Sequence, residues 1–100
     1  PAEVLKRLGD NTAVVCYNDE VAFGLVKCLL NVGRRVPEDV AVVSFDNSNL
    51  SRISQVPITS LSYEDRNIGR IAAQKLVDIL DGKEVSSEVL PWTFIRKESS

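Results

Sequence analysis

Two polar residues with the chemistry of ligand contacts, Asn18 and Asp46, each follow an apolar stretch of the sequence that ends in an aromatic residue. The apolar stretches cover residues 12–17 and 40–45. A carboxylate can accept hydrogen bonds from two neighbouring hydroxyl groups, and an amide can donate and accept at once. The pair therefore suits a small molecule that carries several hydroxyl groups, and we predict that Asn18 and Asp46 bind such a ligand.

Each of these residues also has a structural interpretation. An Asp-Asn pair after a strand commonly forms a turn, which would make Asp46 a turn or capping residue. Asn18 is a natural cap for a helix that begins at Asp19, a role that is compatible with ligand contact. Tyr17 and Phe45 precede the polar residues, and the alternation of side chains along a strand turns their rings away from these neighbours. We expect the two rings to line the site only in part, with core packing as the favoured alternative for Phe45.

The elements that carry these residues predict an α/β domain with a mainly parallel sheet. A helical pattern over residues 19–32 separates the two apolar stretches, which makes them parallel strands joined by a right-handed crossover. The carboxyl ends of the two strands then lie side by side, where open α/β sheets bind ligands. The first stretch, residues 12–17, is continuously apolar, so we expect helices on both faces of this strand.

The remainder of the chain predicts further elements of the same kind. We expect a helix over residues 2–8, a polar loop or short helix over 47–55, an extended edge segment over 56–61, a helix over 64–81, a last strand over 89–95 and a frayed tail over 96–100. Pro57 favours a sheet edge or a crossing over a central strand for the extended segment, because proline cannot donate a hydrogen bond to a neighbouring strand.

The composition argues against several classes of function. The 100 residues are 44% hydrophobic with a formal net charge of −2, which is typical of a globular domain and argues against charge-driven nucleic-acid binding. The chain has no histidine, the commonest general base and metal ligand, and no nucleophile or phosphate-loop motif. We therefore expect no enzymatic activity, no metal and no cofactor. A small α/β enzyme that pairs Asp46 with Glu64 or Asp65 is a weaker alternative, because no spacing supports such a pair.

The two cysteines, Cys16 and Cys28, fall in a predicted strand and a predicted helix, and we expect both to be small buried residues. Isolated cysteines fit a reducing compartment such as the cytoplasm. No apolar run approaches the length of about 20 residues that a membrane span needs. We expect a cytoplasmic protein that does not bind to a membrane.

Four stretches of the sequence, in the same order, resemble the effector-binding domain of the lactose-repressor (LacI/GalR) family of transcriptional regulators. They are residues 12–22, residues 36–47, residues 58–61 together with Gly69, and residues 90–99. The sequence Cys-Tyr-Asn-Asp-Glu of residues 16–20 is most similar to the arabinose-repressor type, which carries this domain behind a winged-helix DNA-binding domain. The resemblance covers nearly the whole chain.

The resemblance implies a Rossmann-like lobe of the periplasmic-binding-protein type I fold, and the chain is similar to the last third of such a domain. Residues 1–61 and 89–96 would belong to the C-terminal lobe, and the helix over 64–81 would belong to the N-terminal lobe. The implied partners are a small carbohydrate effector, a second copy of the chain, and DNA bound through a separate N-terminal domain. A periplasmic sugar-binding protein of an uptake system shares the fold and is the alternative function.

The resemblance also implies roles for single residues at the ligand site. Asn18 and Asp46 match the family's polar ligand contacts in this lobe. Tyr63 falls where the family usually has a glutamine near the ligand, and a tyrosine there could stack on the face of a sugar ring. Ser44 replaces the family's usual glycine before the aromatic residue.

A surface for a second copy is implied in the same way. The family dimerises partly through the helix that follows Asn18, and here the candidates for its partner-facing side are Val21, Leu25 and Cys28. Burial of this helix within its own subunit is the structural alternative. The helix over 64–81 would lack its packing partner in a 100-residue chain, so we also expect this chain to associate with itself.

Overall fold

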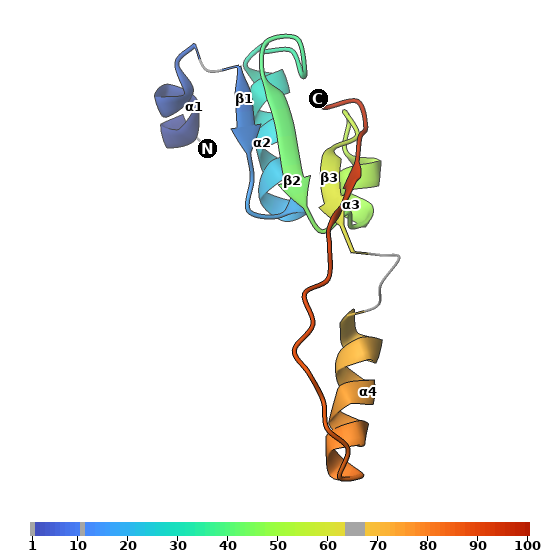
Figure 1. Ribbon diagram of the computed structural model, residues 1–100. Helices are drawn as coiled ribbons and strands as arrows, with labels where there is room; N and C mark the ends of the chain where they lie inside the picture. The colour runs from blue at the N-terminus through green and yellow to red at the C-terminus, as the bar shows by residue number, and fades with distance from the viewer. Residues whose placement is uncertain (1, 11, 64–67) are drawn as a thin grey trace. The chain divides into compact units, whose positions relative to one another are not determined.

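The computed structural model describes residues 2–10, 12–63 and 68–100 of the chain (Figure 1). In chain order its elements are α1 (Ala2–Leu8), β1 (Ala13–Val15), α2 (Asp19–Asn31), β2 (Ala41–Phe45), α3 (Asn49–Ile53), β3 (Thr59–Ser62), α4 (Ile68–Leu80) and β4 (Thr93–Ile95). They fall into two compact units: unit 1 comprises Pro1–Ser62 and Phe94–Ser100, and unit 2 comprises Tyr63–Thr93. The assignment of these units to the lobes of a larger domain stays a prediction.

A four-stranded sheet in the order β1-β2-β3-β4 organises the chain. Strands β1 and β2 run parallel, with Val15 opposite Val43, and β2 and β3 run parallel, with Phe45 opposite Leu61. The predicted α/β architecture with a mainly parallel sheet is confirmed. It brings the carboxyl ends of three successive strands to one edge of the sheet.

The position of β3 differs from the prediction for residues 56–61. β3 lies between β2 and β4, so it is not an edge strand. It begins at Thr59, two residues beyond Pro57, and its backbone pairing therefore does not need the N–H that proline lacks. The last strand is also shorter than the predicted 89–95, and the polar segment 47–55 contains the short helix α3.

Helix α2 begins and ends at the residues that local signals predict. Asn18 has an extended backbone, and its side chain accepts a hydrogen bond from the Val21 N–H, which satisfies one of the unpaired donors of the first turn. Asp19 and Glu20 place negative charge at the positive end of the helix dipole. At the other end Gly33 has a φ of 79°, a left-handed conformation that glycine adopts without steric cost.

Helices α2 and α3 cover one face of the sheet, and the core of unit 1 lies between them and the strands (Figure 1). Along β2 the burial alternates, with Val42 and Ser44 fully buried and their neighbours half-buried. The buried hydrophobic residues of this core are Leu8, Cys16, Ala22, Leu25, Val26, Leu29, Val36, Val40, Val42 and Ile58. Removing a side chain such as Leu29 from water stabilises the folded chain by on the order of 2 kcal/mol.

The prediction of helices on both faces of the strands is wrong for β1. Its Val15 is 69% exposed, and only Val14 turns toward the core. Both α2 and α3 lie on the face that Val14 and Val42 share, which leaves apolar residues of the other face open. The regular strand also ends at Val15 rather than continuing to Tyr17.

The predicted fraying of residues 96–100 is also wrong, because the end of the chain is docked on the sheet. Ser99 is fully buried, and its backbone accepts a hydrogen bond from Val42 N (2.8 Å) and donates one to Pro57 O (2.9 Å). Its hydroxyl donates to Val42 O and accepts from Thr59 N (2.8 Å). Ser99 thus joins β2 to the start of β3.

Unit 2 consists of α4 and the extended segment that follows it. The helix predicted over 64–81 corresponds to α4, and residues 64–67, with the alternative acid–base partners Glu64 and Asp65, lie outside the described residues. No described residue of α4 is buried within the chain. Its exposed apolar side chains are Ile68, Leu76, Val77, Ile79 and Leu80. Lys75 donates a hydrogen bond to Ser86 O (3.0 Å), which ties the returning segment to the helix.

A buried carboxylate connects the carboxyl ends of the three parallel strands. Asp19, the first residue of α2, is 1% exposed. Its Oδ1 accepts hydrogen bonds from Ser44 Oγ of β2 (2.7 Å) and Ser60 Oγ of β3 (2.9 Å). Its Oδ2 accepts a short hydrogen bond from the Ser48 backbone N–H. We call Asp19, Ser44, Ser48 and Ser60 the Asp19 clamp.

The hydrogen bonds of the clamp keep the carboxylate ionised. Burial by itself raises the pKa of Asp19, but the hydrogen bonds from Ser44, Ser48 and Ser60 together outweigh it, so the pKa lies below its ordinary value of 3.8. An ionised acceptor strengthens each of these bonds relative to a neutral one.

Replacing Ser99 with alanine tests the docking of the tail. We expect Ser99→Ala to lower the free energy of unfolding by about 1–3 kcal/mol, because Thr59 N–H and Val42 C=O lose a buried partner. Urea unfolding followed by circular dichroism measures the change. The control is Glu98→Ala at the exposed neighbouring position, for which we expect a change within about 0.5 kcal/mol. Equal effects of the two substitutions would contradict the docked tail.

The clamp makes stability depend on pH in a defined direction. The pKa of Asp19 is lower in the folded than in the unfolded chain. The ionised carboxylate therefore stabilises the folded chain fully above about pH 3.8, and this stabilisation is lost as the pH falls through the folded-state pKa. We expect Asp19→Asn to cost about 1.5–3 kcal/mol at pH 7 and progressively less below pH 4, measured by urea unfolding across that range. Glu20→Gln, an exposed acid in the same helical turn, is the control. A pH-independent cost would contradict the role of the charge.

Candidate functional site

The two predicted ligand contacts lie at the same edge of the sheet. β1 and β2 are parallel neighbours, and the Cys16 N–H donates to Val43 O (2.8 Å) just beyond the paired residues of β1. Asn18 follows the end of β1 and Asp46 follows β2 directly. Both therefore occupy the carboxyl edge, as the sequence predicts, and the Asp19 clamp joins the segments that carry them.

Asn18 caps helix α2, and this role leaves part of its amide for a ligand. Its Oδ1 accepts from Val21 N (3.0 Å), which confirms the structural interpretation of this residue. Its donor end, Nδ2, makes no hydrogen bond to a residue that the structure describes. The half-buried side chain is held in one orientation by the cap, so Nδ2 is a fixed donor beside the sheet edge.

Asp46 has an exposed carboxylate on a strained backbone. Its N–H donates to Leu61 O of β3 (2.9 Å), and its φ of 101° lies in the left-handed region, as does the φ of 54° at Asn47. Such conformations cost on the order of 1 kcal/mol or more per residue when the side chain is not glycine, and they gather at functional sites. The turn interpretation holds for the backbone, whereas the carboxylate bonds no described residue.

The turn after Asp46 is held from the far end of the chain. The buried Asn47 accepts hydrogen bonds at Oδ1 from Lys97 Nζ and from Ser51 Oγ (3.4 Å), and its N–H donates to Ser60 Oγ (2.9 Å). Lys97 Nζ also donates to Ile58 O (3.0 Å). Sequence reasoning missed Lys97, which lies 50 residues from Asn47 and was placed in a frayed tail. No local pattern indicates this contact.

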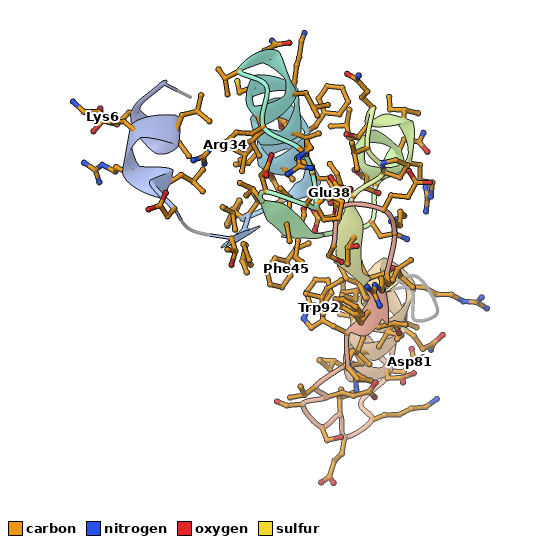
Figure 2. The ribbon with its side chains drawn as sticks, turned by 90° about the horizontal axis from the view of Figure 1, so that it is seen from above. Lys6, Arg34, Glu38, Phe45, Asp81 and Trp92 are labelled. Carbon is orange, nitrogen blue, oxygen red and sulfur yellow. The ribbon has the colours of Figure 1, made fainter. Side chains whose placement is uncertain are left out.

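The two aromatic residues before the polar pair have different surroundings. Tyr17 is 84% exposed. Phe45 is half-buried and lies outside the core cluster, so the favoured alternative of core packing does not hold for it. Figure 2 shows its ring projecting from the sheet on the side away from α2. A contribution of either ring to a ligand site stays a prediction.

Tyr63, the third predicted ligand contact, belongs to unit 2. Its ring packs edge-on against Trp92, with the ring centroids 4.9 Å apart and the planes inclined by 69°. This arrangement is favourable for two aromatic rings and leaves Tyr63 half-buried. Its role in ligand binding stays a prediction.

The residues predicted to face a second copy differ in burial. Val21 is 52% exposed, Cys28 is half-buried, and Leu25 is buried in the core of unit 1. The expectation that both cysteines are buried holds for Cys16, where burial raises the pKa of the thiol. Val21 lines an apolar groove of about 430 Å³ with Val4 and Val15.

Two further features of the described residues concern metal binding and membrane spanning. Among the described residues, no group of three or more His, Cys, Asp or Glu side chains could hold a metal ion. Within the same residues, no helix has the length and apolarity that crossing a membrane requires.

The sequence is similar to known proteins over most of this chain, and the backbone is similar over nearly all of it. Residues 2–100 match the periplasmic binding protein-like domain family. The transcriptional repressor PurR of Vibrio vulnificus (strain CMCP6) is 36% identical over 78 residues, which are 78% of this chain and 23% of that protein. The repressor CytR of Escherichia coli (strain K12) is 36% identical over 76 residues, or 76% of this chain and 22% of that protein.

A solved structure of the transcriptional regulator CelR in complex with cellobiose has a similar backbone. It superposes with a TM-score of 0.89 at 35% identity, covering 99% of this chain and 31% of that chain. The chain thus spans less than a quarter of the length of the two curated relatives and about a third of the solved regulator. The extent of the family match shows that the chain belongs to the periplasmic binding protein-like domain family.

Proposed function

We propose that this chain is part of the effector-binding domain of a LacI/GalR-family transcriptional repressor and that the effector is a small carbohydrate. The observation that carries the proposal is the pairing of Asn18 and Asp46 at the carboxyl edge of neighbouring parallel strands. The similarity of the chain to PurR, CytR and CelR favours a regulator over a periplasmic uptake protein. The wording of residues 16–20 further suggests the arabinose-repressor type.

The proposed chemistry at the site is recognition without catalysis. The exposed Asp46 carboxylate accepts hydrogen bonds from two adjacent hydroxyl groups of a sugar. Asn18 donates from Nδ2 to a third oxygen while its Oδ1 remains on the helix cap. For Tyr63 we propose stacking on the face of a sugar ring, the role that an aromatic side chain can have in carbohydrate binding. The solved CelR structure contains cellobiose, which supports a carbohydrate as the ligand class.

The proposed response is a change in the angle between two lobes. Unit 1 belongs to the C-terminal lobe and α4 to the N-terminal lobe of a two-lobed domain. The effector binds both lobes and favours one angle between them, which alters the spacing of separate DNA-binding domains in a cytoplasmic homodimer. A ligand shifts this equilibrium only through its different affinity for the two arrangements.

Thermal unfolding of the full-length protein with pentoses, hexoses, cellobiose and purines tests the ligand class. We expect one carbohydrate to raise the melting temperature. Asp46→Asn should weaken its binding by about ten- to a hundredfold, because a charged acceptor becomes neutral. Asn18→Asp should also weaken binding while retaining the cap oxygen. Asp10→Asn, an exposed carboxylate before β1 and hence at the opposite end of that strand, is the matched control.

Three results would contradict this proposal. A protein that responds to purines alone would exclude the carbohydrate, and unchanged affinity in Asp46→Asn would exclude the site. A protein that binds sugar but no operator DNA would favour the periplasmic alternative.

The proposed contact of the homodimer includes Val21, which is exposed on α2. We expect the 100-residue chain to sediment as an oligomer, and Val21→Glu to shift it toward the monomer by burying a charge in the contact. Sedimentation velocity over a range of concentrations measures the change. Val32→Glu, at a 59% exposed valine beyond the end of the same helix, is the control and should leave the association unchanged. A monomeric wild-type chain at high concentration would contradict the homodimer.

A further inference from the structure

The buried Asp19 carboxylate contacts both segments that carry the proposed ligand residues. Through the chain it is the immediate neighbour of Asn18. Through Oδ2 it accepts from the Ser48 N–H, two residues beyond Asp46. At 1% exposure the carboxylate is not available to a ligand. Its position therefore affects the site through its neighbours.

A second path runs from Asp19 to the same turn. Ser60 Oγ donates to Asp19 Oδ1 (2.9 Å) and accepts from the Asn47 N–H (2.9 Å). The Ser48 amide is thus bonded to the Asp19 carboxylate directly, and the Asn47 amide is linked to it through the Ser60 hydroxyl. The Asp46 N–H itself is bonded to Leu61 O (2.9 Å).

These hydrogen bonds hold a strained turn, whose backbone would relax to another conformation without them. Asp46 and Asn47 both have positive φ, with values of 101° and 54°, and neither is glycine. Such a conformation persists only when surrounding contacts determine it. Loss of the Asp19 contacts would let the turn relax and would move the Asp46 carboxylate relative to the capped Asn18 amide.

We propose that Asp19 is a positioning residue: its carboxylate holds the turn at Asp46 against the Asn18 segment and so sets the affinity of this edge for hydroxyl-bearing ligands. This inference rests on the proposed function. It adds that the distance between the two ligand contacts is maintained by a group that never touches the ligand.

Two variants test the role of Asp19. Asp19→Asn replaces one carboxylate oxygen with an NH₂ group, whereas three donors now converge on the two oxygens, so at least one of these donors loses its acceptor. Ser60→Ala removes only the path to Asn47 and serves if Asp19→Asn does not fold. Ser99→Ala is the control, because it removes a buried hydroxyl from the same sheet without contact to the clamp.

The first readout is affinity, measured by calorimetry on the full-length protein well below its melting temperature. The probe is the sugar of the panel that raises the wild-type melting temperature. We expect the dissociation constant to rise about tenfold or more in Asp19→Asn and at least threefold in Ser60→Ala, while it stays within about twofold in Ser99→Ala. An unchanged constant in both clamp variants, or an equal rise in Ser99→Ala, would overturn the inference.

The second readout needs no ligand and separates this inference from the proposed function. Amide hydrogen exchange at Asn47 and Ser48 should accelerate at least tenfold in Asp19→Asn relative to amides of the sheet core, and it should not do so in Ser99→Ala. If no sugar binds, the proposed function fails, and faster exchange still shows that Asp19 holds the turn. Unchanged exchange at both amides would overturn the positioning role whatever the ligand.

Discussion

The carboxyl edge of the sheet depends on one ionised group that has been taken out of water. A buried carboxylate is costly unless hydrogen-bond donors surround it. Asp19 accepts hydrogen bonds from β2, from β3 and from the turn between β2 and α3. The buried charge therefore has all its donors only when these three segments are in place at once. The arrangement of the strand ends therefore follows from the solvation requirement of a single residue.

The strained turn at Asp46 is a consequence of this constraint. Its two left-handed residues are held by Asp19 and Ser60 on one side and by Lys97 on the other. Lys97 also donates to Ile58 O (3.0 Å), so its ammonium group links Asn47 to the segment just before β3. The carboxylate of Asp46 is exposed, but the backbone that carries it is held by hydrogen bonds within unit 1. A rigid binding site requires such an arrangement.

The apolar surfaces of the chain have a different physical origin. A parallel sheet ordinarily carries helices on both faces, and here α2 and α3 cover one of them. Val15 of β1 is exposed on the uncovered side, and Tyr17, Val21 of α2 and the apolar side chains of α4 are exposed as well. Exposed apolar area of this kind marks surfaces that take part in association, which is the physical reason for proposing a homodimer.

The sequence by itself determined the features that arise within a few residues: the α/β order of elements, the Asn18 cap, the end of α2 at Gly33, and the placement of Asn18 and Asp46 after neighbouring strands. Periodicity, capping and turn chemistry are local, so they can be read from a single chain. Only the tertiary structure decided that Asp19 is buried between strands, that Ser99 and Lys97 are docked, that β3 is internal and that β1 is open on one face. The burial of Asp19 and the docking of Ser99 and Lys97 depend on contacts between residues 25 to 57 positions apart, and no local pattern encodes which distant donor will meet which acceptor.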